Sequence, residues 1–188
     1  MTDDASFPRL VSLACHDVRT PLATVFGFAR MIERAGKLDE QNARFMGMIS
    51  EAATEMAGLL DELAVAARIE GRRWEPALSE ADTLDLATVD DERIATSGRG
   101  EVVATEPQAV RRSLRAFAIA AVRHGPVESV TWTVDGRELR LAEITEAAAP
   151  IVLGEEVRDL GALVGRSVIE TLGGTVELDG DRLVVTLS

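Results

Sequence analysis

The sequence has little of what builds disulfide frameworks, metal centres or membrane spans. Its 188 residues include one cysteine, Cys15, and two histidines. A single cysteine excludes an internal disulfide, and no Cys/His cluster suggests a structural metal. No run of 18 apolar residues is present, and the start MTDDASFPRL is too acidic and polar for a signal peptide. We therefore expect a cytoplasmic protein with no membrane partner.

Positive charge is also scarce. The chain has 20 Lys and Arg residues against 32 Asp and Glu, which gives a formal net charge of −12. A chain this acidic is repelled by phosphate backbones, so we expect no nucleic-acid partner. Hydrophobic residues make up 46% and charged residues 28%, a normal balance for a globular protein with one large domain or two small ones.

The first third of the chain has the pattern of two long helices. Residues 5–35 form one candidate helix and residues 40–70 the other, with Gly36 as the C-cap residue of the first. Apolar residues recur in alternating steps of four and three, as in a heptad seam. On the first helix these are Phe7, Val11, Ala14, Val18, Pro21, Val25, Phe28 and Ile32. On the second they are Phe45, Ile49, Ala52, Met56, Leu59, Leu63 and Ala66.

Two such helices joined by a short connection form an antiparallel hairpin. The apolar faces are wider than a contact between two helices needs, because Leu10, Leu22, Met48 and Leu60 extend them. Two hairpins that pair as a four-helix bundle would bury both faces, which predicts a homodimer. The alternative is a hairpin that packs on the rest of its own chain.

The second half has a mixed pattern. We expect strands at residues 101–105, 130–134, 139–144, 175–178 and 182–187, and helices at 108–124 and 160–172. The acidic stretch from Ser79 to Glu92 has no clear period and is expected to be a solvated linker with one short helix or little order. Strand hairpins turned at Asp135-Gly136 and Asp179-Gly180-Asp181 suggest antiparallel strands with helices on one face.

The predicted fold class is therefore α+β, a long antiparallel helical hairpin followed by a small α/β sandwich. We expect a helical domain over residues 1–71. Residues 72–100 form a linker and the reduced start of a second domain, and residues 101–188 form that α/β domain.

His16 and its neighbours could form a nucleophilic site. His16 lies two positions from each of Ala14 and Val18, about 200° around a helix, so it points away from the bundle core. Asp17 follows directly, and its carboxylate can hold one ring proton while the other nitrogen acts as a nucleophile. Pro21 has no N–H to give to the carbonyl of Asp17, so the helix should bend just below the site. By itself, an exposed histidine is more often solvated surface.

The sequence motif at residues 16–22 favours a chemical role for His16. It reads His-Asp-Val-Arg-Thr-Pro-Leu and closely resembles the phosphoacceptor box of sensor histidine kinases, His-[Glu/Asp]-x-Arg-Thr-Pro-Leu. The resemblance covers about 65 residues, up to the end of the second helix. It implies a dimerisation and histidine phosphotransfer domain.

The resemblance also assigns roles to single residues. It implies that His16 is the phosphoacceptor and Asp17 its acid/base partner. Thr20 occupies the position that supports dephosphorylation of a receiver in that family. Arg19 and Pro21 are expected to support the site or to face the partner.

In that family a Bergerat-type ATP-binding domain follows, and the second half resembles it in degenerate form. The metal-holding asparagine falls at Ala120, and a second asparagine at Ala116. No Asp-x-Gly-x-Gly follows the strand at 139–144, and Asp159 would place negative charge near a triphosphate. Framework positions such as Gly173-Gly174 match. The pattern predicts that the fold persists and that nucleotide binding is lost. We expect His124 to be a helix-end residue.

These observations predict a histidine phosphotransfer protein of a bacterial two-component phosphorelay. His16 would accept a phosphoryl group from one response-regulator receiver aspartate and donate it to another. No cofactor is expected, since the receiver supplies its own magnesium. One alternative is an active histidine kinase with an atypical ATP site. The other is a non-catalytic bundle that binds and regulates a kinase or a receiver.

Overall fold

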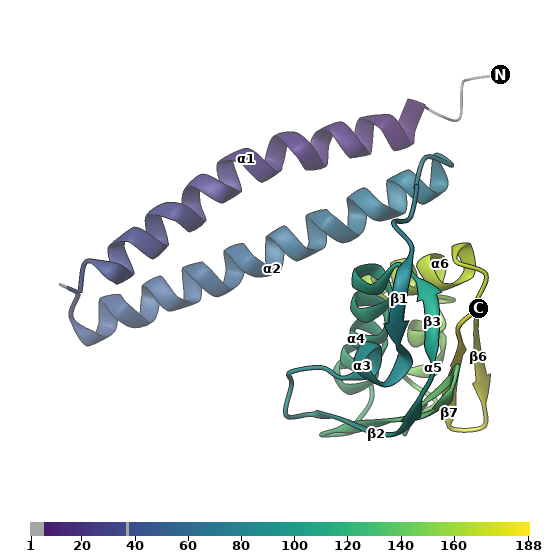
Figure 1. The fold of residues 1–188 in the computed structure, drawn as a ribbon. Helices are drawn as coiled ribbons and strands as arrows, with labels where there is room; N and C mark the ends of the chain where they lie inside the picture. Colours follow the sequence, from purple (N-terminus) through teal and green to yellow (C-terminus); the bar gives the residue numbers. More distant parts are fainter. Residues whose placement is uncertain (1–5, 37) are drawn as a thin grey trace. The chain divides into compact units, whose positions relative to one another are not determined.

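The chain forms two compact units in a computed structural model that describes residues 6–36 and 38–188. The first unit comprises Met1–Trp74 and the second Glu75–Ser188 (Figure 1). The expected helix start at residue 5 lies outside the described residues, as does Lys37 in the expected connection. Among the helices described, none combines the length and the hydropathy required to span a bilayer.

The first unit is a helical hairpin of α1 (Ser6–Arg34) and α2 (Glu40–Glu70). Gly36 has a φ of +62°, a left-handed conformation that glycine adopts without strain, so its predicted place as a C-cap residue is confirmed. The Asp39 carboxylate caps α2 by accepting from the backbone N–H of Asn42 at 2.8 Å. Both predicted helices are thus confirmed within a residue or two.

The contact between α1 and α2 uses a different row of residues from the predicted seams. The buried residues recur every seven positions on α1 and are small on α2. They are Pro8, Cys15, Leu22 and Ala29 on α1, and Ser50, Ala53, Ala64 and Ala67 on α2. Small side chains let the helices approach closely.

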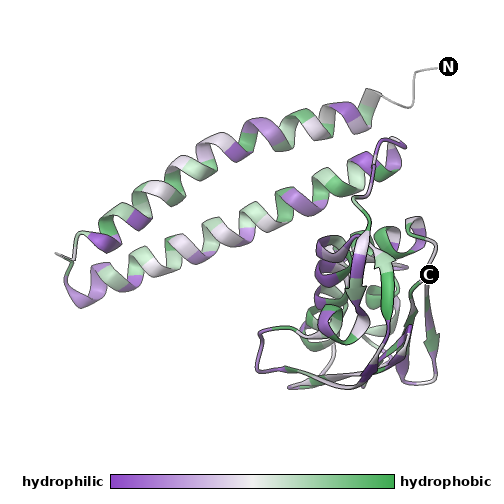
Figure 2. Ribbon diagram, viewed as in Figure 1, coloured by the Kyte–Doolittle hydropathy of each residue, from purple (hydrophilic) through white to green (hydrophobic). Residues whose placement is uncertain are grey.

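Most residues of the two predicted seams therefore lie outside the contact between α1 and α2. The exposed members include Phe7, Val18, Val25, Phe28, Ile32, Phe45, Ile49, Met56, Leu59 and Leu63. A single hairpin therefore leaves these apolar residues uncovered, as expected from faces wider than a contact between two helices needs. Figure 2 shows hydrophobic residues recurring along both helices among polar ones.

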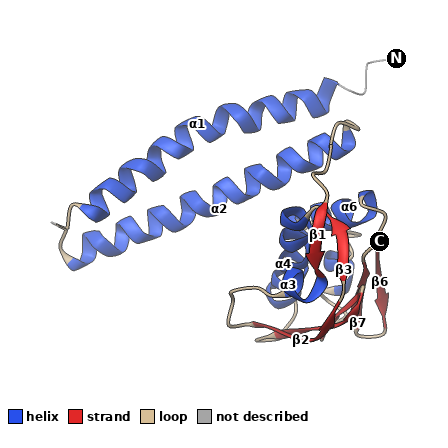
Figure 3. Ribbon diagram, in the orientation of Figure 1, coloured by secondary structure: helices blue, strands red, loops and turns tan. Residues whose placement is uncertain are grey.

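The second unit contains a five-stranded sheet in the order β2-β4-β5-β7-β6 and a two-stranded sheet of β1 and β3 (Figure 3). The strands are β1 (Ser79–Asp82), β2 (Ile94–Gly100), β3 (Val102–Thr105), β4 (Val130–Gly136), β5 (Glu138–Ala142), β6 (Thr175–Asp179) and β7 (Arg182–Thr186). The helices are α3 (Thr83–Ala87), α4 (Pro107–His124), α5 (Ala149–Val152) and α6 (Leu160–Thr171). The mixed α+β fold class is confirmed.

The region expected to be a solvated linker is structured, so that expectation is corrected. It holds β1 and α3, and the Asp82 carboxylate caps α3 by accepting from the N–H of Leu84 at 2.8 Å. Leu86 and Ala87 are fully buried. Strand β2 was also missed, and it pairs in parallel with β4, whereas only antiparallel pairs were expected. Its sequence, IATSGRG, has too few apolar residues for a clear period of two.

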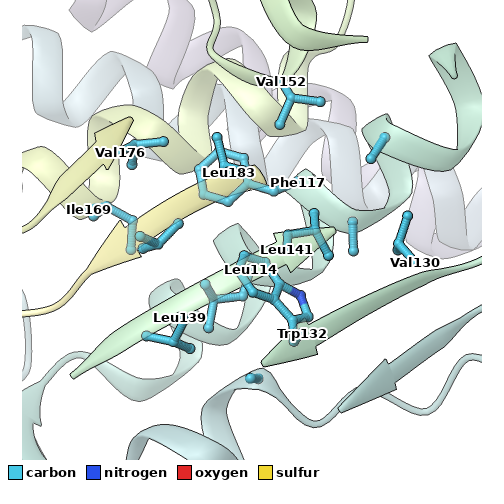
Figure 4. Packing of buried hydrophobic residues seen from close by; sticks show 14 of the residues in the cluster. Leu114, Phe117, Val130, Trp132, Leu139, Leu141, Val152, Ile169, Val176 and Leu183 are labelled. Carbon is cyan, nitrogen blue, oxygen red and sulfur yellow. The ribbon is translucent and has the colours of Figure 1, made fainter. Parts of the chain in front are cut away.

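The core of this unit lies between the five-stranded sheet and helices α4 and α6. Trp132 of β4 and Phe117 of α4 are completely buried, with Leu114, Leu139, Leu141 and Leu183 around them (Figure 4). The predicted hairpin of β4 and β5 is confirmed, with Gly136 in the left-handed region at a φ of +62°.

Candidate functional site

His16 lies near the middle of α1 on its solvent side. Its side chain is 74% exposed, and that of Asp17 is 67% exposed. The His16 Nδ1 atom lies 3.1 Å from Asp17 Oδ1, within hydrogen-bond distance. The structure thus confirms the predicted outward position of the imidazole and brings the carboxylate to it.

This contact determines which ring nitrogen is available. With the proton on Nδ1, the ring donates a hydrogen bond to Asp17, and Nε2 keeps its lone pair. An exposed nitrogen lone pair can attack an electrophile that a partner brings to it. The carboxylate stabilises the positive charge that the ring gains when Nε2 forms a bond.

An open hollow of about 480 Å³ lies beside the imidazole. It is lined by His16, Arg19, Thr20, Ala23 and Thr24, which share one side of α1 because they are spaced by one and two turns. Two of the predicted site residues, Arg19 and Thr20, are therefore brought to His16.

Pro21 is not among the residues that line this hollow. Helix α1 continues through it, and Thr24 Oγ1 donates a hydrogen bond to the carbonyl of Thr20 at 3.2 Å. The role predicted for Pro21 toward a partner stays a prediction.

An ion pair links the site to the second helix. Arg19 Nη2 donates to Asp61 Oδ1 at 2.6 Å, from α1 to α2. Sequence reasoning missed Asp61, because the pair depends on the register between two helices, and no local motif marks it. In the single hairpin, Arg19 is thus held by its own chain.

In the α/β unit, alanines stand at the two positions where the resemblance to histidine kinases would place asparagines, Ala116 and Ala120. Ala120 is completely buried on α4. The nearby Asp159 is almost fully buried and caps α6, where its Oδ1 accepts from the N–H of Ala162 at 3.1 Å.

Two side chains from the end of α4 face the same carboxylate. Arg123 Nη1 lies 3.1 Å and His124 Nε2 lies 3.4 Å from Asp159 Oδ2. The N-terminus of α6, a position where helices often hold phosphate, is thus occupied by a side chain of this protein. His124 is the last residue of α4, as predicted.

Metal-ligating clusters are not found in the described part of the chain. No group of three or more His, Cys, Asp or Glu side chains gathers in residues 6–36 and 38–188. The site of interest is therefore the pair of His16 and Asp17 with its neighbours on α1.

Known proteins share both the sequence of the first unit and the fold of the whole. A sequence model of the His Kinase A (phospho-acceptor) domain matches residues 9–72. The sensor protein DivL of Caulobacter vibrioides is 27% identical over 78 residues, which are 42% of this chain and 10% of DivL. The chain thus spans about a tenth of the curated relative that it matches.

Two of the solved structures that match are similar over almost the whole chain. The crystal structure of full-length ShkA in complex with AMPPNP has a TM-score of 0.68 and 21% identity, over 95% of this chain and 45% of ShkA. The Acinetobacter baumannii histidine kinase AdeS has a TM-score of 0.56 and 17% identity, over 91% of this chain and 95% of AdeS. Residues 9–72 therefore match the His Kinase A (phospho-acceptor) domain, and the chain shares its fold with these two structures.

Proposed function

We propose that this protein is a histidine phosphotransfer protein of a two-component phosphorelay, which accepts and donates a phosphoryl group at His16. The observation that carries the proposal is the exposed imidazole with Asp17 at its Nδ1 atom, 3.1 Å away, inside a phosphoacceptor domain. The partners are response-regulator receiver domains, whose phosphorylated aspartate is the donor.

The transfer needs only groups that the two proteins hold. His16 Nε2 attacks the phosphorus of the receiver's acyl phosphate, the N–P bond forms, and the P–O bond to the receiver's aspartate breaks. The aspartate leaves as a carboxylate, and the Nδ1 proton stays hydrogen-bonded to Asp17. Magnesium belongs to the receiver, so this chain contributes position and a nucleophile. The reverse reaction passes the group to a second receiver.

Thr20 belongs to the same site in this proposal. It lies one turn from His16 and lines the same hollow. Its hydroxyl is placed to orient a water molecule or a polar group of the docked receiver.

The α/β unit supports transfer without ATP. Ala116 and Ala120 stand where asparagines would meet the nucleotide and its metal, and no Asp-x-Gly-x-Gly is present in the sequence. The buried Asp159 carboxylate already occupies the N-terminus of α6 and accepts from the Ala162 N–H. These features disfavour a triphosphate, because ligands are lost and this helix end is taken by a side chain.

An active kinase is the second candidate, because ShkA was solved with AMPPNP and shares the fold over 95% of this chain. Isothermal titration calorimetry with magnesium and ATP separates the two. We expect no heat of binding at millimolar nucleotide. Saturable binding, or labelling of His16 from ATP alone, would favour the kinase.

We also propose that two hairpins pair as a four-helix bundle. The large apolar side chains exposed on the single hairpin include Val25, Phe28, Ile49, Met56 and Leu59. Their burial would contribute the hydrophobic free energy that one hairpin leaves unused. The homodimer would carry two His16 sites.

Transfer from phosphorylated receivers tests the proposal. Acid-labile phosphate should accumulate on the wild-type chain and on His124→Gln, the matched control that removes the only other histidine. His16→Gln should accept none while its circular dichroism is unchanged, because the side chain faces solvent. Phosphate on His16→Gln, or no transfer from any receiver of the same cell, would refute the proposal.

A further inference from the structure

Arg19 lies between two anionic partners. In the hairpin its Nη2 atom is 2.6 Å from Asp61 Oδ1 on α2. It also lines the hollow beside His16, three residues away on the same side of α1. A phosphoryl group on His16 Nε2 would enter the surroundings of this guanidinium.

The pair with Asp61 is easy to replace. Its side chains are 46% and 40% exposed, so water screens the attraction, and exposed ion pairs of this kind are weak. A phosphoryl group carries more charge than a carboxylate and presents three acceptor oxygens. Guanidinium binds such groups with two parallel hydrogen bonds, which makes phosphate the stronger competitor.

We infer that Arg19 is shared between Asp61 and a phosphoryl group on His16, so that these two residues set the lifetime of the phosphohistidine. Asp61 holds Arg19 while His16 is free, and the phosphoryl group draws it away when His16 is modified. Arg19 and Asp61 are therefore positioning residues of this site. The inference rests on the proposed function to the extent that His16 carries phosphate.

The expected effect on lifetime follows from the chemistry of hydrolysis. Water attacks phosphorus, the N–P bond breaks, the bonding pair returns to Nε2, and inorganic phosphate leaves. In a loose, metaphosphate-like transition state, the phosphoryl group carries less net negative charge than in the intact phosphohistidine, because the bonding electrons leave with nitrogen. A guanidinium on the phosphoryl oxygens therefore stabilises the intact phosphohistidine more than the transition state, and hydrolysis slows.

Phosphoramidate provides a test that needs no receiver. His16 Nε2 displaces ammonia from it, so the P–N bond of the reagent breaks as the new N–P bond forms. The decay of the phosphohistidine signal in ³¹P NMR then gives the lifetime on the full-length chain. With His124→Gln as the background, only His16 can be labelled.

Each variant has a distinct expected lifetime. Arg19→Gln should shorten it about threefold and Asp61→Asn should lengthen it about threefold, the size expected of a half-exposed charge contact. The double variant should match Arg19→Gln, because Asp61 acts through Arg19. Arg19→Lys should keep part of the effect by retaining the charge.

Two matched controls remove a charge elsewhere on the hairpin. Arg30→Gln changes another exposed arginine of α1, and Glu51→Gln an exposed carboxylate of α2. Neither should alter the lifetime. Thermal melts of each variant report any loss of the hairpin.

The outcomes separate this inference from the proposed function. Equal lifetimes in wild type, Arg19→Gln and Asp61→Asn would overturn the inference, even if receivers label His16. An additive double variant would overturn it too. Opposite effects of the two variants would support it, even if no receiver transferred phosphate and the proposed function were lost. Failure of phosphoramidate to label His16 would overturn the inference, and the proposed function would still be tested separately by transfer from receivers.

Discussion

The two units of this protein differ in how they use hydrophobic residues. The α/β unit buries its largest side chains, Trp132 and Phe117, in one core. The hairpin buries small residues between its helices and leaves large ones such as Phe28 and Leu59 exposed. The same contrast holds for polar groups, since Asp159 is held inside the α/β unit while His16 and Asp17 face water. The proposed chemistry, which needs a partner protein, thus lies in the unit with the open surface.

The largest expected effect concerns the closed core. Phe117→Ala should destabilise the α/β unit by about 3–5 kcal/mol, through lost burial and the cavity left behind. Urea unfolding followed by tryptophan fluorescence, in a Trp74→Phe background that leaves Trp132 as the reporter, would measure this. Labelling of His16 by phosphoramidate should be unchanged, which would sharpen the contrast between the units.

The matched control for that variant is Val102→Ala on β3, whose side chain is exposed. It should change stability by no more than about 0.5 kcal/mol. A loss of His16 labelling in Phe117→Ala would show that the units are not independent.

A charged substitution on the exposed apolar face of the hairpin tests whether two hairpins pair. Val25→Asp should dissociate the proposed dimer, because an unpaired charge buried in the bundle costs several kcal/mol. Light scattering after size exclusion should give twice the monomer mass for the wild type and one monomer mass for the variant. Gln41→Asp adds the same charge at an exposed polar position and should stay dimeric. A wild-type monomer at micromolar concentration would contradict the bundle.

The carboxylate beside the imidazole should affect rate and leave stability unchanged. Asp17→Asn is expected to slow transfer from a phosphorylated receiver about 10²-fold, because the carboxylate no longer stabilises the positive charge that the ring gains. Rapid-quench kinetics would measure it, with Glu51→Gln as the control for loss of one exposed negative charge. Equal rates for Asp17→Asn and wild type would show that the Asp17 carboxylate does not contribute to phosphoryl transfer.

The two units differ in how much of their structure could be predicted from the sequence. The hairpin, the outward position of His16 and most strands of the second half were predictable, because each depends on local periodicity or turn chemistry. The row of Cys15, Leu22 and Ala29 was not, since several rows of a heptad pattern are apolar and only packing selects one. Asp61 was missed because its contact with Arg19 depends on the register of α2.

The missed elements of the α/β unit have a similar cause. Strand β2 has few apolar residues, and its place beside β4 depends on contacts distant in sequence. The acidic composition of residues 79–92 suggested a solvated segment, yet Leu86 and Ala87 supply enough apolar surface to join the core.

The smallest expected effect is electrostatic and lies in the α/β unit. Hydrogen bonds from the Arg93 side chain and backbone lower the pKa of Asp91 to about 2, from an ordinary value of 3.8. Because the pKa is lower in the folded state, this carboxylate stabilises the fold above pH 3.8, and the contribution is lost as the pH falls toward 2.

Asp91→Asn should therefore be slightly less stable than wild type at pH 6, by a fraction of a kcal/mol because the partner is exposed. The difference should shrink as the pH falls below 4 toward 2, as measured by urea unfolding across that range. A difference that stayed constant with pH would mean that the ionised carboxylate does not stabilise the fold.

The central claim is that His16 receives phosphate from another protein's aspartate and not from ATP. Intact mass spectrometry of the wild-type chain, after incubation with either phosphorylated receivers or magnesium and ATP, tests it most directly. The account predicts one added phosphoryl group, located on His16, with a receiver present and none with nucleotide alone. A phosphoryl group on His16 from ATP alone, or none from any receiver, would contradict it.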